Sequence, residues 1–156
     1  MDIVKITDYI TEDLINLKLK STNKTEVLEE LSDLLAKSDN VGENKTVVYK
    51  ALISREKLGS TGIGKGVAVP HAKTDVIKGL TIAFGISENK IDFKSIDDED
   101  VNIFFVFASP TKDSQTYLKV LARISRLIRE SAFRKELLNC KSPKEVIESI
   151  NKRESV

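Results

Sequence analysis

Residues 101–107 read VNIFFVF, and this short stretch decides the fold class. Asn102 is its only polar residue, so both faces of a strand built from it would be almost entirely apolar. Successive side chains of a strand point to opposite faces, and a run that is apolar on both must be covered on both. The stretch therefore predicts a central strand with helices on each side of its sheet.

Other short apolar runs predict the strands that accompany it. Leu80–Ile86 reads LTIAFGI and predicts a second strand, and Val67–Val69 predicts a brief strand that Pro70 ends. A further strand is expected near residues 15–19, after a short helix at the N-terminal end.

Helical spacing of apolar residues accounts for most of the remaining chain. Residues 114–129 predict the clearest amphipathic helix, whose expected apolar side is formed by Leu118, Leu121, Ala122, Ile124 and Leu127. Further helices are expected after an Asn23 cap, from Asn44 to Gly59, over residues 131–139, and after Ser142-Pro143. Helices and strands intermix along 156 residues, which predicts one layered α/β (α+β-like) domain over residues 1–156.

Composition excludes several classes of protein. The chain is 40% hydrophobic and 31% charged with a formal net charge of +1, which is typical of a globular domain and does not indicate nucleic-acid binding. No apolar run approaches the roughly 18 residues that a membrane helix needs, and the N-terminus does not resemble a secretory signal. Cys140 is the single cysteine, so no intrachain disulfide can form, and we expect a cytoplasmic protein.

The glycine-rich stretch Leu58–His71, LGSTGIGKGVAVPH, begins two nucleotide-binding motifs and completes neither. A P-loop requires Ser or Thr after its lysine, but Gly66 follows Lys65. A dinucleotide fingerprint requires a third glycine where Val67 stands. Both motifs also lead from a strand into a helix, whereas this stretch is expected to lead from a helix into a strand. The stretch therefore predicts no nucleotide site.

Two interpretations of the glycines remain open. Closely spaced glycines let successive N–H groups point into one concavity that holds an anion, and they equally permit a tight connection with positive φ. If the loop binds phosphate, its candidate residues are Ser60, Thr61, Gly62 and Gly64.

His71 is the only histidine, and Pro70 gives it a stiff support. Co-ligands are scarce, so neither a metal site nor a cofactor is expected. A neutral imidazole can attack phosphorus, and an arginine fork such as that of Arg55 suits phosphate oxygens. The alternative for His71 is an ordinary histidine, either exposed or buried with its hydrogen bonds made. The alternative for Arg55 is a cation that complements a helix C-terminus.

Residues 54–71, SREKLGSTGIGKGVAVPH, closely resemble the signature of enzyme IIA components of the bacterial phosphoenolpyruvate-dependent sugar phosphotransferase system. The class is the fructose–mannitol (type 2) one, which includes nitrogen-regulatory relatives. Phe107-Ala108-Ser109-Pro110, followed by Leu118 and Leu121-Ala122, resembles the second half of the same family. The resemblance extends over essentially the whole chain.

The resemblance implies that His71 is the phosphorylation site and that Arg55 assists it. It implies a mixed β-sheet packed between helices, in a three-layer arrangement. It also implies a phosphocarrier that accepts phosphoryl from HPr and passes it to a IIB component for sugar uptake. Such a protein is peripheral to a membrane transporter at most. The alternative is a regulatory, nitrogen-type protein whose phosphorylation state controls other proteins.

Tyr117 departs from the family pattern, because many relatives have a second histidine at this position. A phenol donates a hydrogen bond but stays uncharged near neutral pH. Tyr117 is therefore either a second partner of the phosphoryl group or a half-buried residue at a helix start.

Overall fold

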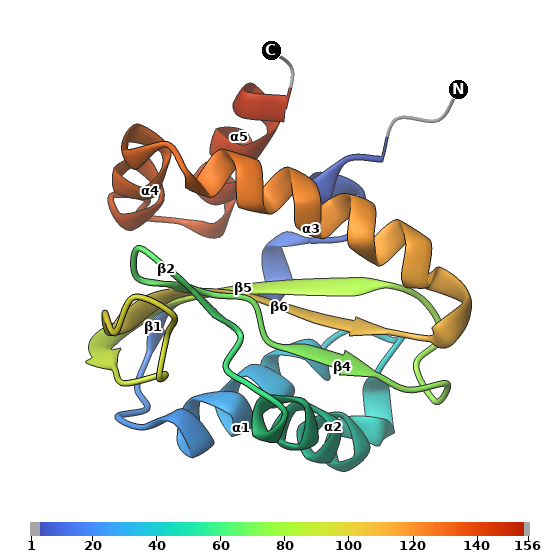
Figure 1. Ribbon diagram of the computed structural model, residues 1–156. Coiled ribbons are helices and arrows are strands. Elements are labelled where there is room, and N and C mark those ends of the chain that lie inside the picture. Colours follow the sequence, from blue (N-terminus) through green and yellow to red (C-terminus); the bar gives the residue numbers. More distant parts are fainter. Residues whose placement is uncertain (1–3, 155–156) are drawn as a thin grey trace.

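A mixed sheet lies between two layers of helices in the computed structural model, which describes residues 4–154 (Figure 1). This arrangement confirms the predicted α/β fold class. Residues 1–3 and 155–156 of the expected domain lie outside the described residues. The strands are β1 (Ile15–Leu19), β2 (Gly62–Gly64), β3 (Val67–Ala68), β4 (His71–Lys73), β5 (Thr81–Ile91) and β6 (Val101–Ser109).

Two of the helices cover one face of the sheet, and three lie on the other (Figure 1). The first layer consists of α1 (Lys24–Leu35) and α2 (Lys45–Lys57), and the second of α3 (Ser114–Ile128), α4 (Ser131–Leu138) and α5 (Pro143–Glu154). Short 3-10 turns complete the order: η1 (Ile6–Asp8), η2 (Glu12–Leu14), η3 (Gly42–Asn44) and η4 (Thr111–Asp113). The N-terminal part thus contains two such turns instead of the expected short helix.

The strand β6 is the central one. Its antiparallel neighbour on one side is β5, which in turn pairs in parallel with β1. Along its other side run two short parallel strands, β3 and then β4, and β2 pairs with the outer edge of β3. Pro70 separates β3 from β4, and its carbonyl still accepts the Phe107 N–H at 2.9 Å. One interrupted strand therefore accompanies β6 along most of its length.

Side chains of β6 alternate between the two helical layers, as its sequence predicts. Ile103, Phe105 and Phe107 pack in a core cluster with residues of α3, α4 and α5. Phe104 and Val106 pack in a second cluster with residues of α1 and α2. All five are at most 1% exposed, so the central strand is covered on both faces.

The apolar side of α3 differs from the expected one. Val120, Ile124, Leu127 and Ile128 are the buried residues of this helix, whereas Leu118 is 59% exposed and Ala122 is also exposed. Leu118 lies two residues before Val120, which is about 200° around a helix. When Val120 faces the sheet, Leu118 therefore faces solvent.

The glycine stretch forms a hairpin of β2 and β3, with a turn at Gly64, Lys65 and Gly66 whose φ angles are +96°, 59° and +81°. Gly62 packs against the segment between β5 and β6. A Cβ placed on Gly62 would lie 2.1 Å from Ser95 Oγ and 3.1 Å from its Cα. Only glycine fits here, because the backbone of Ser95 is part of the obstruction.

We expect Gly62→Ala to destabilise the protein by about 1–3 kcal/mol, because the added methyl group forces the hairpin away from Ser95. Urea denaturation measures the change. Gly79→Ala is the matched control, since its Cβ would find its nearest neighbour, Asn40 Nδ2, at an ordinary 3.6 Å. Equal midpoints for both variants would contradict this account.

Candidate functional site

The imidazole of His71 lies between β4 and the first turn of α3. Its ring stacks on the Tyr117 ring, with centroids 3.9 Å apart and an interplanar angle of 11°. The Phe107 ring meets His71 edge-on at 6.4 Å and Tyr117 edge-on at 5.1 Å. Two aromatic rings therefore fix the imidazole plane on the α3 side of the sheet, and the His71 side chain stays half-buried.

The chain immediately after β6 brings Tyr117 to this position. Pro110 ends the strand, η4 turns the chain, and Ser114 Oγ donates to the Thr111 carbonyl at 2.8 Å. Asp113 Oδ2 accepts the Leu80 N–H at 3.1 Å, which ties the turn to the start of β5. The first turn of α3 is thereby held above the end of the sheet, beside His71.

Ser109 is a contact of His71 that the sequence did not single out. Its Oγ lies 3.1 Å from His71 Nε2, and the residue is 0% exposed. His71 pairs with Phe107 and Lys73 with Ser109, so Ser109 lies diagonally across the strand pair from His71, on the same face. The alternation Phe107-x-Ser109 indicates that both side chains lie on one face of the strand. Only the register of β4 against β6 shows that His71 lies on that face beside them.

The surroundings of His71 favour its neutral form. Burial lowers the pKa of His71 from 6.5 to about 4, with smaller contributions from the charges of Lys73 and Arg55. Burial also raises the pKa of Tyr117, against the opposing charge of Arg55. Near neutral pH the stack therefore consists of an uncharged imidazole and an uncharged phenol.

Arg55 lies in the last turn of α2, and its Nη1 donates to the Gly59 carbonyl at 2.8 Å. The guanidinium thus satisfies a carbonyl just beyond the helix, as one of the two interpretations held. Its charge also acts on both His71 and Tyr117. No hydrogen bond of the described residues joins Arg55 to His71 or Tyr117, so Arg55 acts on the stacked pair through its charge.

The hydroxyls of Ser60 and Thr61 are already engaged within the protein. Ser60 Oγ donates to the Phe93 carbonyl at 2.5 Å and accepts the Gly62 N–H at 3.0 Å. Thr61 donates its N–H to Glu56 Oε1 at 3.1 Å and its hydroxyl to Glu56 Oε2. The Thr61 bonds tie the start of the glycine stretch to α2, and the Ser60–Phe93 bond ties it to the segment after β5.

Gly62 and Gly64 lie further from the ring along the sheet. Gly64 pairs with Val67, whose neighbour on β6 is Ile103, whereas the neighbour of His71 is Phe107. Four residues of strand correspond to about 13 Å. The structure does not bring Gly64 to the imidazole, and phosphate binding by the four loop residues stays a prediction.

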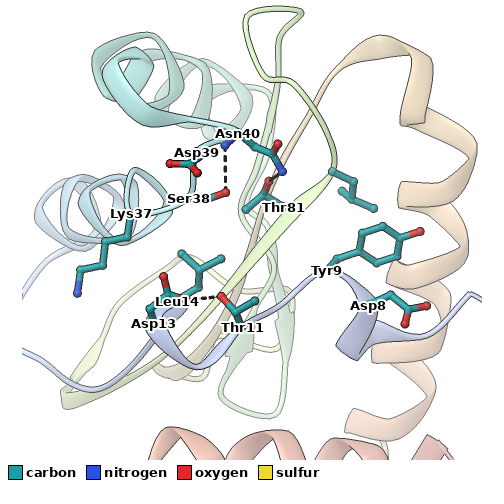
Figure 2. Close-up of a pocket in the computed structure, with 11 residues that line it drawn as sticks. Asp8, Tyr9, Thr11, Asp13, Leu14, Lys37, Ser38, Asp39, Asn40 and Thr81 are labelled. Atoms are coloured by element: carbon teal, nitrogen blue, oxygen red, sulfur yellow. Dashed lines mark hydrogen bonds between the residues drawn. The ribbon is translucent and has the colours of Figure 1, made fainter.

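A separate hollow of about 430 Å³ lies at the start of β5 (Figure 2). Among its described lining residues, Asp8, Asp13 and Asp39 are acidic and Lys37 is the one cation, so its charge is unsuited to an anion. None of its lining residues is His71, Arg55 or Tyr117. Within residues 4–154, no cluster of His, Cys, Asp and Glu has the form of a metal site, and no helix is long and apolar enough to cross a membrane.

We expect the single histidine to titrate near pH 4 in the folded protein, as followed by its ring signals in NMR spectra. Tyr117→Ala should raise this pKa toward 6.5, because it removes the ring that shields the imidazole from water. Tyr117→Phe should leave the pKa almost unchanged, because it keeps the stacked ring. A wild-type pKa near 6.5 would contradict the proposed shielding.

The same shift makes stability depend on pH. His71 takes up its proton near pH 6.5 in the unfolded chain but only near pH 4 in the folded protein, because its pKa falls to about 4 on folding. Its contribution to the free energy of unfolding is therefore complete above pH 6.5 and is lost as the pH falls to 4. Urea unfolding at several pH values measures the free energy of unfolding. As the pH falls from 6.5 to 4, this free energy should decline less for His71→Gln than for the wild type. Identical declines would count against the linkage.

Comparison with known proteins identifies the family. The model of the family described as phosphoenolpyruvate-dependent sugar phosphotransferase system, EIIA 2, matches residues 8–153. The PTS system fructose-specific EIIABC component of Bacillus subtilis (strain 168) is 35% identical over 152 residues, which is 97% of this chain. The chain spans only 24% of that relative.

Solved structures agree with the fold. The nitrogen regulatory protein IIA-Ntr from Neisseria meningitidis superposes with a TM-score of 0.86 at 29% identity, covering 93% of this chain and 98% of that chain. The complex of enzyme IIAMTL and phosphorylated enzyme IIBMTL from Escherichia coli contains a chain with a TM-score of 0.78 at 20% identity, covering 92% of this chain and 97% of that one. The chain described here belongs to the EIIA 2 family of the phosphoenolpyruvate-dependent sugar phosphotransferase system.

Proposed function

We propose that this chain is a cytoplasmic phosphocarrier that accepts a phosphoryl group on His71 from HPr and passes it to a IIB component for uptake of a sugar of the fructose–mannitol class. The observation that carries the proposal is the half-buried His71 imidazole stacked on Tyr117, whose pKa burial lowers to about 4 with a smaller contribution from the Arg55 charge. A nucleophile needs its lone pair free of a proton, and a pKa of about 4 leaves it free near neutral pH.

The transfer step balances without a net proton movement. The lone pair of one His71 ring nitrogen forms a bond to phosphorus, while the phosphorus–nitrogen bond of the donor phosphohistidine breaks and returns its electron pair to the donor ring. The His71 ring keeps its existing proton and becomes a phosphorylated imidazolium. The donor ring, which carried the same charge, becomes a neutral imidazole. Transfer to the IIB component reverses these roles.

Arg55 is the cation for the developing charge. In the unphosphorylated protein its guanidinium is bound only to a neutral carbonyl, that of Gly59, among the hydrogen bonds of the described residues. A phosphoryl group on His71 offers charged oxygens, which bind a guanidinium more strongly than a carbonyl does. Arg55 can therefore exchange one acceptor for the other, and charge stabilisation of this kind is a large part of phosphoryl-transfer catalysis.

Tyr117 replaces the second histidine of many relatives without adding a charge. Its ring shields one face of the imidazole, so the partner protein must approach from elsewhere. Its neighbour Leu118 is 59% exposed and supplies an apolar contact on the adjacent surface. A small surface of this kind suits a transient protein complex.

A regulatory function is the second candidate, and the similarity to the nitrogen regulatory protein of Neisseria meningitidis favours it. In that case the phosphorylated form persists when IIB components are added. Rapid loss of the phosphoryl group to a IIB component supports the transport function instead.

We expect His71→Ala to abolish phosphorylation in a mixture of phosphoenolpyruvate, the general donor proteins and HPr, because no other histidine is present. Radiolabel on the protein is the measurement. Circular dichroism should show an intact fold, which excludes unfolding as the cause. Label on the variant equal to that on the wild type would place the phosphoryl group elsewhere.

Arg55→Ala should slow transfer by about 10- to 100-fold, because it removes the cation that stabilises the phosphoryl oxygens. Lys57→Ala is the matched control, since Lys57 is an exposed cation of the same helix end. Rapid-quench measurement of phosphorylation separates the two. Equal rates for both variants would reduce Arg55 to a helix-capping residue.

A further inference from the structure

The hydroxyl of Ser109 has a single hydrogen-bond partner among the described residues. That partner is His71 Nε2, 3.1 Å away. The backbone of Ser109 is fixed within the sheet, where its carbonyl accepts the Thr74 N–H at 3.0 Å. Since the residue is 0% exposed in the unphosphorylated protein, solvent water does not reach the hydroxyl in that state.

Burial decides which atom donates. A hydroxyl that accepted a proton from Nε2 would leave its own O–H buried without an acceptor, which carries a substantial free-energy penalty. The Ser109 O–H therefore donates to Nε2. That nitrogen then carries the lone pair, and the ring proton resides on Nδ1.

The remaining contacts of the ring fix its plane but not its tautomer. Tyr117 stacks on one face of the imidazole, and Phe107 meets it edge-on. Neither ring offers a hydrogen bond in the imidazole plane. Only the Ser109 hydroxyl distinguishes the two ring nitrogens among the contacts of the described residues.

We propose that Ser109 is a positioning residue for the nucleophile: its hydroxyl selects the Nδ1–H tautomer of His71 and afterwards donates to an oxygen of the phosphoryl group on Nε2. The second half of this inference rests on the proposed function, whereas the first half does not. No covalent bond of Ser109 changes. As phosphorus approaches, the O–H leaves the nitrogen lone pair for a phosphoryl oxygen, so one hydrogen bond replaces another.

Nitrogen NMR of the single histidine tests the tautomer directly. We expect the wild-type ring to show a protonated Nδ1 and an unprotonated Nε2, and the Ser109→Ala ring to show a mixture of both tautomers. Ser32→Ala is the matched control, because Ser32 is also 0% exposed and its Oγ donates to the Leu28 carbonyl at 2.8 Å. The control should retain the wild-type spectrum. If the loss of any buried hydroxyl changed the ring through a structural effect, the spectrum of Ser32→Ala would change as well.

A wild-type ring protonated on Nε2, or a Ser109→Ala spectrum identical to that of the wild type, overturns the tautomer assignment.

The role of Ser109 in phosphoryl transfer is tested separately. With HPr as donor, Ser109→Ala should be phosphorylated about 10-fold more slowly than the wild type, the worth of about one hydrogen bond, and Ser32→Ala at the wild-type rate. Equal rates for Ser109→Ala and the wild type overturn the role in transfer. A wild type that takes no label contradicts the proposed function instead, and the spectra still decide the tautomer.

Discussion

The pairing of β6 on both sides is the constraint on which the rest of the structure depends. A strand that is apolar on both faces has to lie inside the sheet, and β5 occupies only one of its sides. The other side is completed by β3 and β4, which are joined across Pro70 by the hydrogen bond to Phe107. The register that results places His71 beside Phe107 and within reach of Ser109.

Aromatic packing then determines the chemistry of the imidazole. A histidine exposed at a strand end would be partly protonated near neutral pH. Here Tyr117 covers a face of the ring, and burial is the main cause of its low pKa. Lys73 and Arg55 act in the same direction, because a cation disfavours a second positive charge nearby. In the proposed function, the cations that suit the phosphoryl group thus also keep the His71 imidazole neutral.

Long periodic segments carried most of the predictable information. The alternation of β6 and the helices α1, α3 and α5 follow from apolar spacing, and Asn23 caps α1 as its side chain suggests, by accepting the Glu26 N–H at 2.9 Å. The strands β2 and β4 were not expected. Each is three residues long, too short for a periodic pattern, and β2 consists of Gly-Ile-Gly.

The candidate site was predictable only where one residue carried the signal. His71 and Arg55 stand out by type and by resemblance to a family. The engagement of Thr61 by Glu56 could not be foreseen, because it depends on how the chain turns after α2. The contact of Ser109 with His71 could not be foreseen either, because it depends on the register of β4 and a serine at a strand end has many ordinary roles.

The short length of β4 limits the pairing of strands between copies of the protein. Among the strand pairings of residues 4–154, β4 has β6 on one side and no strand on the other, so it forms an edge of the sheet. Open edges recruit strands from neighbouring molecules and promote aggregation. This edge is only three residues long, begins directly after a proline that lacks an N–H, and ends in an exposed lysine. In the proposed function His71 meets other proteins, and it lies on an edge too short and too interrupted to pair with strands of neighbouring molecules.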